Sequence, residues 1–164
     1  MSNRGVIESA KEVNDKLMHS SKQSLQYAKK DEKDEKEEDY RSVLNFGHTI
    51  GHALETHTQY KDLLHGEAVA VGMALATSLS QSENLCDSST LKRIYHLIQR
   101  AGLNTKLPPD IKIEHLVKTM EMDKKSKEGR IKFVLCSGLG KTRFKWLSTA
   151  EIVAKLNQAQ FVID

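Results

Sequence analysis

Apolar and polar positions divide the chain into two parts near residue 40. Residues 1–40 are polar and rich in charge, and every position of 29–39 (KKDEKDEKEED) carries a charged side chain. The alternating signs in that run are typical of an exposed helix with ion pairs one turn apart, or of a flexible linker. We therefore interpret residues 1–40 as a charge-rich helical or flexible segment and residues 41–164 as one packed domain.

The apolar positions after residue 40 predict mostly helices. A repeat close to 3.6 residues predicts helices over about 41–58, 66–83, 88–101, 113–122 and 148–156. Residues 66–83 are apolar around most of the helix circumference, which is typical of a central, buried helix. Either Ser88 or Ser89 is suited to cap the third helix, and Gly102 is suited to end it.

The end of the chain has a different pattern. Residues 130–137 alternate between apolar and polar side chains and are rich in β-branched residues, and 138–140 (GLG) have the composition of a turn. Residues 142–147 are then placed to pair back as a second strand. The predicted fold class is mainly α: a multi-helix domain with a small C-terminal β-hairpin.

Composition excludes several classes of protein. The chain has 164 residues, a formal net charge of +3 and two cysteines. No apolar run reaches the roughly 18 residues of a membrane span, and the N-terminus lacks the apolar stretch of a signal peptide. Cys86 and Cys136 are too far apart in sequence for a metal-binding spacing. We expect a cytoplasmic protein with reduced thiols and no nucleic-acid or membrane partner.

A group of histidines carries the candidate chemistry. His48 and His52 lie four residues apart, so both rings project from one face of the predicted helix, and His65 follows after a short loop. Gly47 and Gly51 repeat the same spacing beside them. A glycine inside a helix costs about 1 kcal/mol relative to alanine, so this pattern indicates that something approaches the helix backbone closely.

Neutral imidazole is a common ligand of divalent metals, and these residues therefore predict a metal site. Spacing alone leaves the ligand set open. His48, His52 and His65 supply three ligands in one alternative, and a carboxylate from elsewhere replaces one of them in another. Glu67 either orients a ligand imidazole or acts at the start of its helix, and we favour the helix-start role.

The residues around these histidines resemble a known family. Residues 41–53 (RSVLNFGHTIGHA), followed by 64–69 (LHGEAV), closely resemble the C-terminal half of 3-dehydroquinate synthase, a sugar-phosphate cyclase. The acidic residues 34–37 and the downstream segment 123–140 are also similar to that family. The resemblance extends from about residue 31 to 158 and implies a dehydroquinate synthase-like C-terminal domain.

The resemblance also implies roles for individual residues. It makes His48 and His65 ligands of zinc or cobalt, together with a glutamate that lies outside this chain. It places His52 near the phosphate of the substrate. The remaining implied site residues hold anionic groups of the substrate or contribute a carboxylate to the site; they are Arg41, Asn45, Glu37 and one of Lys124 and Lys125.

The implied activity is that of a carbon–oxygen lyase acting on phosphate. Enzymes of this family use a divalent metal and NAD to eliminate phosphate from 3-deoxy-D-arabino-heptulosonate 7-phosphate and cyclise it to 3-dehydroquinate, in the shikimate pathway of aromatic amino acid biosynthesis. The NAD-binding half of the family is absent from this sequence. We therefore expect the chain alone to be inactive, and to form a homo-oligomer (a dimer) or to associate with the missing half.

Two other functions stay open at the level of the sequence. The first is a related sugar-phosphate cyclase, or a metal-dependent polyol dehydrogenase of the same broad fold. Arg41 and the late lysines argue against the dehydrogenase, because a polyol has no acid or phosphate for them to bind. The second is a non-catalytic helical module that binds a partner.

Overall fold

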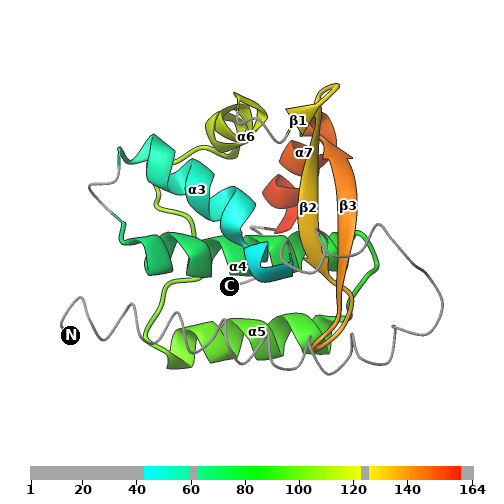
Figure 1. Ribbon diagram of the computed structural model, residues 1–164. Coiled ribbons are helices and arrows are strands. Elements are labelled where there is room, and N and C mark those ends of the chain that lie inside the picture. The colour runs from blue at the N-terminus through cyan, green and yellow to red at the C-terminus, as the bar shows by residue number, and fades with distance from the viewer. Residues whose placement is uncertain (1–42, 60–62, 123–125, 160–164) are drawn as a thin grey trace.

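A computed structural model describes residues 43–59, 63–122 and 126–159. It contains helices packed around one central helix, with a small sheet at one side (Figure 1). In chain order the elements are η1 (Val43–Asn45), α3 (His48–His57), α4 (His65–Ser82), α5 (Ser88–Arg100), α6 (Ile113–Met122), β1 (Ser126–Lys127), β2 (Arg130–Cys136), β3 (Thr142–Ser148) and α7 (Thr149–Ala159). The predicted fold class is therefore confirmed.

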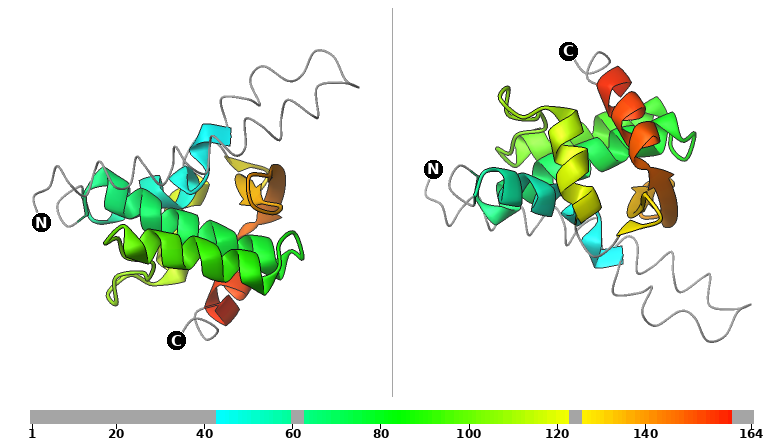
Figure 2. Two further views of the ribbon diagram at one scale, coloured as in Figure 1. Left: turned by 90° about the horizontal axis from the view of Figure 1, so that it is seen from below. Right: turned by 90° about the horizontal axis from the view of Figure 1, so that it is seen from above.

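Helix α4 forms the centre of the fold, as its apolar composition predicted. Every residue from Ala68 to Ser80 is buried, and two apolar clusters meet on this helix. One cluster joins α4 to α3, α6, α7 and the inner face of the sheet, and the other joins it to α5 and the opposite face of the sheet. Figure 2 shows α4 lying between the other elements in both views. None of the described helices is long and apolar enough to cross a membrane.

The first helix begins later than the sequence predicted. In place of one helix over 41–58, a 3-10 turn (η1) precedes Gly47, and α3 begins at His48. Gly47 has a φ of 81°, a left-handed conformation that interrupts the helix and that glycine adopts without steric cost. The apolar repeat continues across this break, so periodicity alone did not reveal it.

Helix α5 is capped by a residue other than the two predicted serines. Its N-cap is Asp87, whose side chain accepts a hydrogen bond of 2.8 Å from the backbone N–H of Thr90. The prediction was wrong by one residue, because aspartate caps as well as serine does and stands directly before both serines. At the other end, Gly102 adopts a φ of 76° just after the helix, as predicted.

The sheet contains the predicted hairpin and one short additional strand. Strands β2 and β3 pair antiparallel from Arg130 opposite Ser148 to Cys136 opposite Thr142, and β1 pairs with the start of β2. The far end of β2 is fixed to the central helix, because the backbone N–H of Cys136 donates a 2.9 Å hydrogen bond to Ser80 Oγ. Ser148 ends β3 and caps α7 by binding Glu151 reciprocally.

Candidate functional site

Helices α3 and α4 approach each other closely because glycines line their contact. A Cβ added to Gly72 would lie 2.1 Å from the carbonyl oxygen of Gly47, and one added to Gly51 would lie 3.1 Å from the Cα of Val69. The sequence predicted that something approaches the backbone at Gly47 and Gly51. The structure identifies it as the backbone of α4. These glycines therefore bring the face of α3 that carries His48 and His52 beside the start of α4, where His65 lies.

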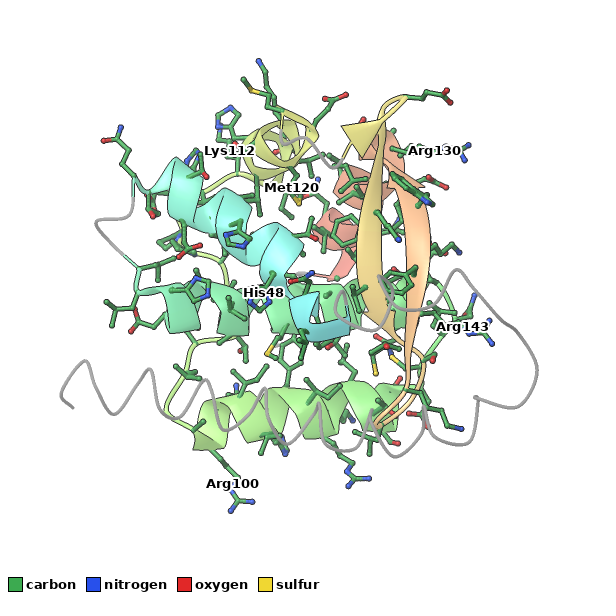
Figure 3. The ribbon with its side chains drawn as sticks, viewed as in Figure 1. His48, Arg100, Lys112, Met120, Arg130 and Arg143 are labelled. Atoms are coloured by element: carbon green, nitrogen blue, oxygen red, sulfur yellow. The ribbon has the colours of Figure 1, made fainter. Side chains whose placement is uncertain are left out.

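The three histidine rings form a compact triangle. The ring centroids of His48 and His52 are 5.8 Å apart, those of His48 and His65 are 5.7 Å apart, and those of His52 and His65 are 5.8 Å apart. Figure 3 places His48 where the beginning of α3 passes over α4. The structure thus brings together all three histidines that the sequence singled out.

A buried carboxylate supports two of these rings. Glu55 lies one turn after His52 on α3, and its side chain is only 6% exposed. Its Oε1 lies 2.8 Å from Nδ1 of His65, and its Oε2 lies 3.2 Å from Nδ1 of His52. The side chains of His65 and His52 are 57% and 48% exposed, so both rings reach the surface of the molecule.

Glu55 is the site residue that sequence reasoning missed. The signal for it was its spacing of three residues from His52, which places both side chains on one helix face. The contact with His65 spans ten residues and a loop, so it was not readable from local spacing. Glu67, in contrast, has the predicted helix-start role: its Oε2 accepts a 2.9 Å hydrogen bond from the backbone N–H of Leu64.

The ligand set of a metal at the triangle stays a prediction. Among the described residues, no group of three or more His, Cys, Asp or Glu side chains is arranged to hold a metal ion. His48 Nδ1 faces the carbonyl oxygen of Phe46 at 3.4 Å.

The other predicted site residues are placed only in part. Asn45 ends η1 and is half-buried, two residues before the helix that carries His48. The remaining four lie outside the described residues; they are Glu37, Arg41, Lys124 and Lys125. Their roles stay predictions.

A separate cavity of about 350 Å³ lies between α4, α5 and the turn that contains Pro108 and Pro109. Its buried polar groups already bind each other, since the hydroxyl groups of Ser78 and Tyr95 are 3.0 Å apart and Tyr95 also donates to the carbonyl oxygen of Ala74. None of the candidate site residues lines this cavity. We therefore place the functional site at the histidines, where groups with acid–base and ligand chemistry converge.

Comparison with known proteins identifies a family. Residues 5–126 match a family model described as 3-dehydroquinate synthase C-terminal. The chain is 46% identical over 143 residues to the 3-dehydroquinate synthase of Thermoanaerobacter pseudethanolicus, covering 87% of this chain and 40% of that protein. It is 48% identical over 107 residues to the enzyme of Dichelobacter nodosus, covering 65% and 29%. The chain thus spans less than half the length of these relatives.

Solved structures with a similar fold are larger proteins as well. A 2-deoxy-scyllo-inosose synthase complexed with carbaglucose-6-phosphate, NAD⁺ and Co²⁺ is 26% identical with a TM-score of 0.63, covering 71% of this chain and 33% of that one. A 2-epi-5-epi-valiolone synthase from Streptomyces hygroscopicus with NAD⁺ and Zn²⁺ bound is also 26% identical, with a TM-score of 0.62 and coverage of 73% and 33%.

Proposed function

The chain belongs to the 3-dehydroquinate synthase C-terminal family, and on that premise we propose that it is the metal- and substrate-binding half of a 3-dehydroquinate synthase. The complete enzyme would eliminate phosphate from 3-deoxy-D-arabino-heptulosonate 7-phosphate and cyclise the product. The observation that carries the proposal is the triangle of His48, His52 and His65 with Glu55 behind it. The relatives are about twice as long or more, so the NAD-binding half is expected to be supplied by residues beyond this chain.

The residues present suit a divalent metal. Ligand imidazoles commonly donate their second ring N–H to a carboxylate, which is the relation of His65 to Glu55. His48 and His65 provide two imidazoles from adjacent helices, and the family resemblance implies a glutamate as the third ligand. Two cyclases of similar fold carry Co²⁺ or Zn²⁺. Such an ion, when bound, lowers the pKa of a coordinated hydroxyl and polarises a carbonyl.

The chain's own side chains then bind and orient the substrate. His52 keeps its Nδ1 on Glu55, and only the doubly protonated ring can also donate a hydrogen bond from Nε2 to a phosphate oxygen. Arg41 suits a carboxylate or a phosphate because guanidinium forms two parallel hydrogen bonds. Asn45 and one of Lys124 and Lys125 complete the anion-binding set of the proposal, and Glu37 contributes a carboxylate to the site.

A related sugar-phosphate cyclase is the second candidate, because both solved relatives act as cyclases of other sugars by name. The two candidates differ in substrate. A dehydroquinate synthase requires the carboxylate of the seven-carbon acid, whereas a hexose phosphate has none. Phosphate release from each compound should therefore be measured after the chain is mixed with NAD and the separately produced NAD-binding half of a bacterial relative. The cytoplasmic location and the oligomeric state stay predictions.

Calorimetric titration with zinc tests the metal site directly. We expect the chain to bind one zinc ion, and both His48→Ala and His65→Ala to abolish this binding. His96→Ala is the matched control, since His96 is exposed on α5 and belongs to another face of the molecule; it should bind zinc as the unchanged chain does. Absence of zinc binding, or binding that survives both site substitutions, would contradict the proposed metal half-site.

A further inference from the structure

Glu55 is buried in a place where burial alone would disfavour a carboxylate. Its side chain is 6% exposed, and within the described ranges its oxygens lie within hydrogen-bond distance of two histidine Nδ1 atoms. Buried carboxylates are retained when their oxygens are satisfied by donors. Each oxygen of Glu55 faces one histidine, so a single carboxylate supports a ring from α3 and a ring from α4.

The chemistry of the carboxylate fixes where the ring protons lie. An ionised carboxylate only accepts hydrogen bonds, so Nδ1 of both His52 and His65 must carry a proton. In a neutral imidazole the other nitrogen is then the acceptor. Both rings therefore hold an unprotonated Nε2, on the edge that faces away from Glu55. For a metal ligand this is the reactive state, because a metal needs the nitrogen lone pair.

We propose that Glu55 is a positioning residue that fixes His52 and His65 together in the Nδ1-protonated form, with both Nε2 atoms on the edge that faces away from Glu55. The functional meaning of this orientation rests on the proposed function, in which His65 is a candidate metal ligand and His52 a candidate substrate contact. What is new is that one carboxylate fixes the proton positions of both rings. The candidate metal ligand His65 and the candidate substrate contact His52 are therefore oriented by the same group.

The contacts of Glu55 with His65 and with His52 differ in length, and this difference predicts how Glu55→Gln should behave. His65 lies 2.8 Å from Glu55 and His52 lies 3.2 Å away, so His65 holds the stronger hydrogen bond. Glutamine has the shape of glutamate but offers one accepting oxygen and one donating nitrogen. In Glu55→Gln the oxygen should remain with His65, and the amide N–H should face His52. His52 must then accept at Nδ1 and carry its proton on Nε2.

Nitrogen NMR of the chain with isotope-labelled histidine measures this proton placement without any metal. With both rings neutral, the unchanged chain should show Nδ1 protonated on both His52 and His65. Glu55→Gln should move the proton of His52 to Nε2 and leave His65 unchanged. Glu67→Gln is the matched control, because Glu67 lies two residues after His65 but binds the backbone of Leu64. It should leave both rings as they are.

The spectrum of the unchanged chain is decisive even if a variant fails to fold. Nε2-protonated rings at both positions would overturn the inference, and so would a Glu55→Gln spectrum identical to that of the unchanged chain. Zinc titration adds a second measurement. Loss of a hydrogen-bond partner behind a metal ligand typically weakens metal binding about 10–100-fold. We expect the low end of that range for Glu55→Gln and the high end for Glu55→Ala.

The two proposals fail in different ways. If the unchanged chain binds no zinc while its ring protons lie as expected, the metal half-site is contradicted and the role of Glu55 in placing the rings stands. If zinc binds at His48 and His65 while the ring protons lie on Nε2, the metal half-site stands and the role of Glu55 is contradicted.

Discussion

Glu83 shows how a single side chain joins three elements. It follows the last residue of α4, its side chain is 8% exposed, and it pairs with Lys145 of β3 and Lys155 of α7. Burial opposes ionisation of the carboxyl group, but the two ammonium groups outweigh it, and the pKa of Glu83 lies below its ordinary value of 4.5. The ionised carboxylate thus connects the end of the central helix to the C-terminal elements.

This pKa predicts a pH dependence of stability. A carboxyl group with a lowered pKa in the folded state contributes stability above its unfolded pKa and loses it as the pH falls through the folded pKa. Glu83→Gln should therefore lower the free energy of unfolding by about 1–3 kcal/mol at pH 7. The difference from the unchanged chain should narrow as the pH falls below the ordinary carboxyl pKa and disappear below the lower pKa of the folded state. Urea unfolding across this range, with exposed Asp110→Asn as the control, measures it. A difference that stays constant down to the lowest pH would contradict the argument.

At the scale of elements, the contact between α3 and α4 is what assembles the site. Neither helix carries all three histidines, and the rings meet only because the two backbones approach at Gly47, Gly51 and Gly72. The histidines and the first two glycines were recognisable in the sequence as one pattern. Gly72 was not, because it lies in the middle of an apolar helix that needs no special feature to be buried.

Gly72→Ala tests this contact. In an exposed helix the change should stabilise by about 1 kcal/mol. Here the new Cβ would lie 2.1 Å from the carbonyl oxygen of Gly47, which is backbone and has little freedom to move. We therefore expect a loss of about 1–3 kcal/mol in the free energy of unfolding, measured by urea denaturation. The same variant should bind zinc more weakly, since α3 must shift. An increase in stability would show that the contact tolerates a wider separation.

At the scale of the whole molecule, the two apolar clusters share α4. Residues on different faces of this helix, such as Leu79 and Met73, belong to different clusters, and strand β2 also contributes to both. Loss of either cluster exposes one side of the central helix. The described part of the chain is therefore expected to unfold as one cooperative unit.

Two spectroscopic probes test this cooperativity. Trp146, the single tryptophan, lies on β3 and is 38% exposed, so its fluorescence reports on the sheet, whereas far-UV circular dichroism reports on the helices. Their denaturation midpoints should coincide. Leu79→Ala should lower both together, with a loss of about 2–5 kcal/mol. A Trp146→Phe variant establishes that the fluorescence change comes from this residue. Separate transitions would show that the sheet unfolds independently of the helices.

The sequence by itself determined the local features of this protein. The apolar pattern predicted helices over 66–83 and 113–122 and the hairpin, and the structure has the two helices at 65–82 and 113–122. The motif around His48 and His52 identified the family, which the comparisons confirmed. The sequence pattern misplaced the start of α3 and the cap of α5. Each depends on local energies of about 1 kcal/mol: the first at a glycine in a left-handed conformation, the second at the aspartate beside the predicted serines.

Only the tertiary structure decided how the histidines are used. It placed His65 within 5.8 Å of two rings from another helix, and it put the buried carboxylate of Glu55 between His52 and His65. Contacts of this kind join residues that are distant in sequence, and they depend on how closely two helices approach. The approach is governed by glycines whose role appears only when the partner backbone is in place. Spacing along the chain predicted the ligand chemistry, and the packing of α3 on α4 determined the positions of the groups that carry it.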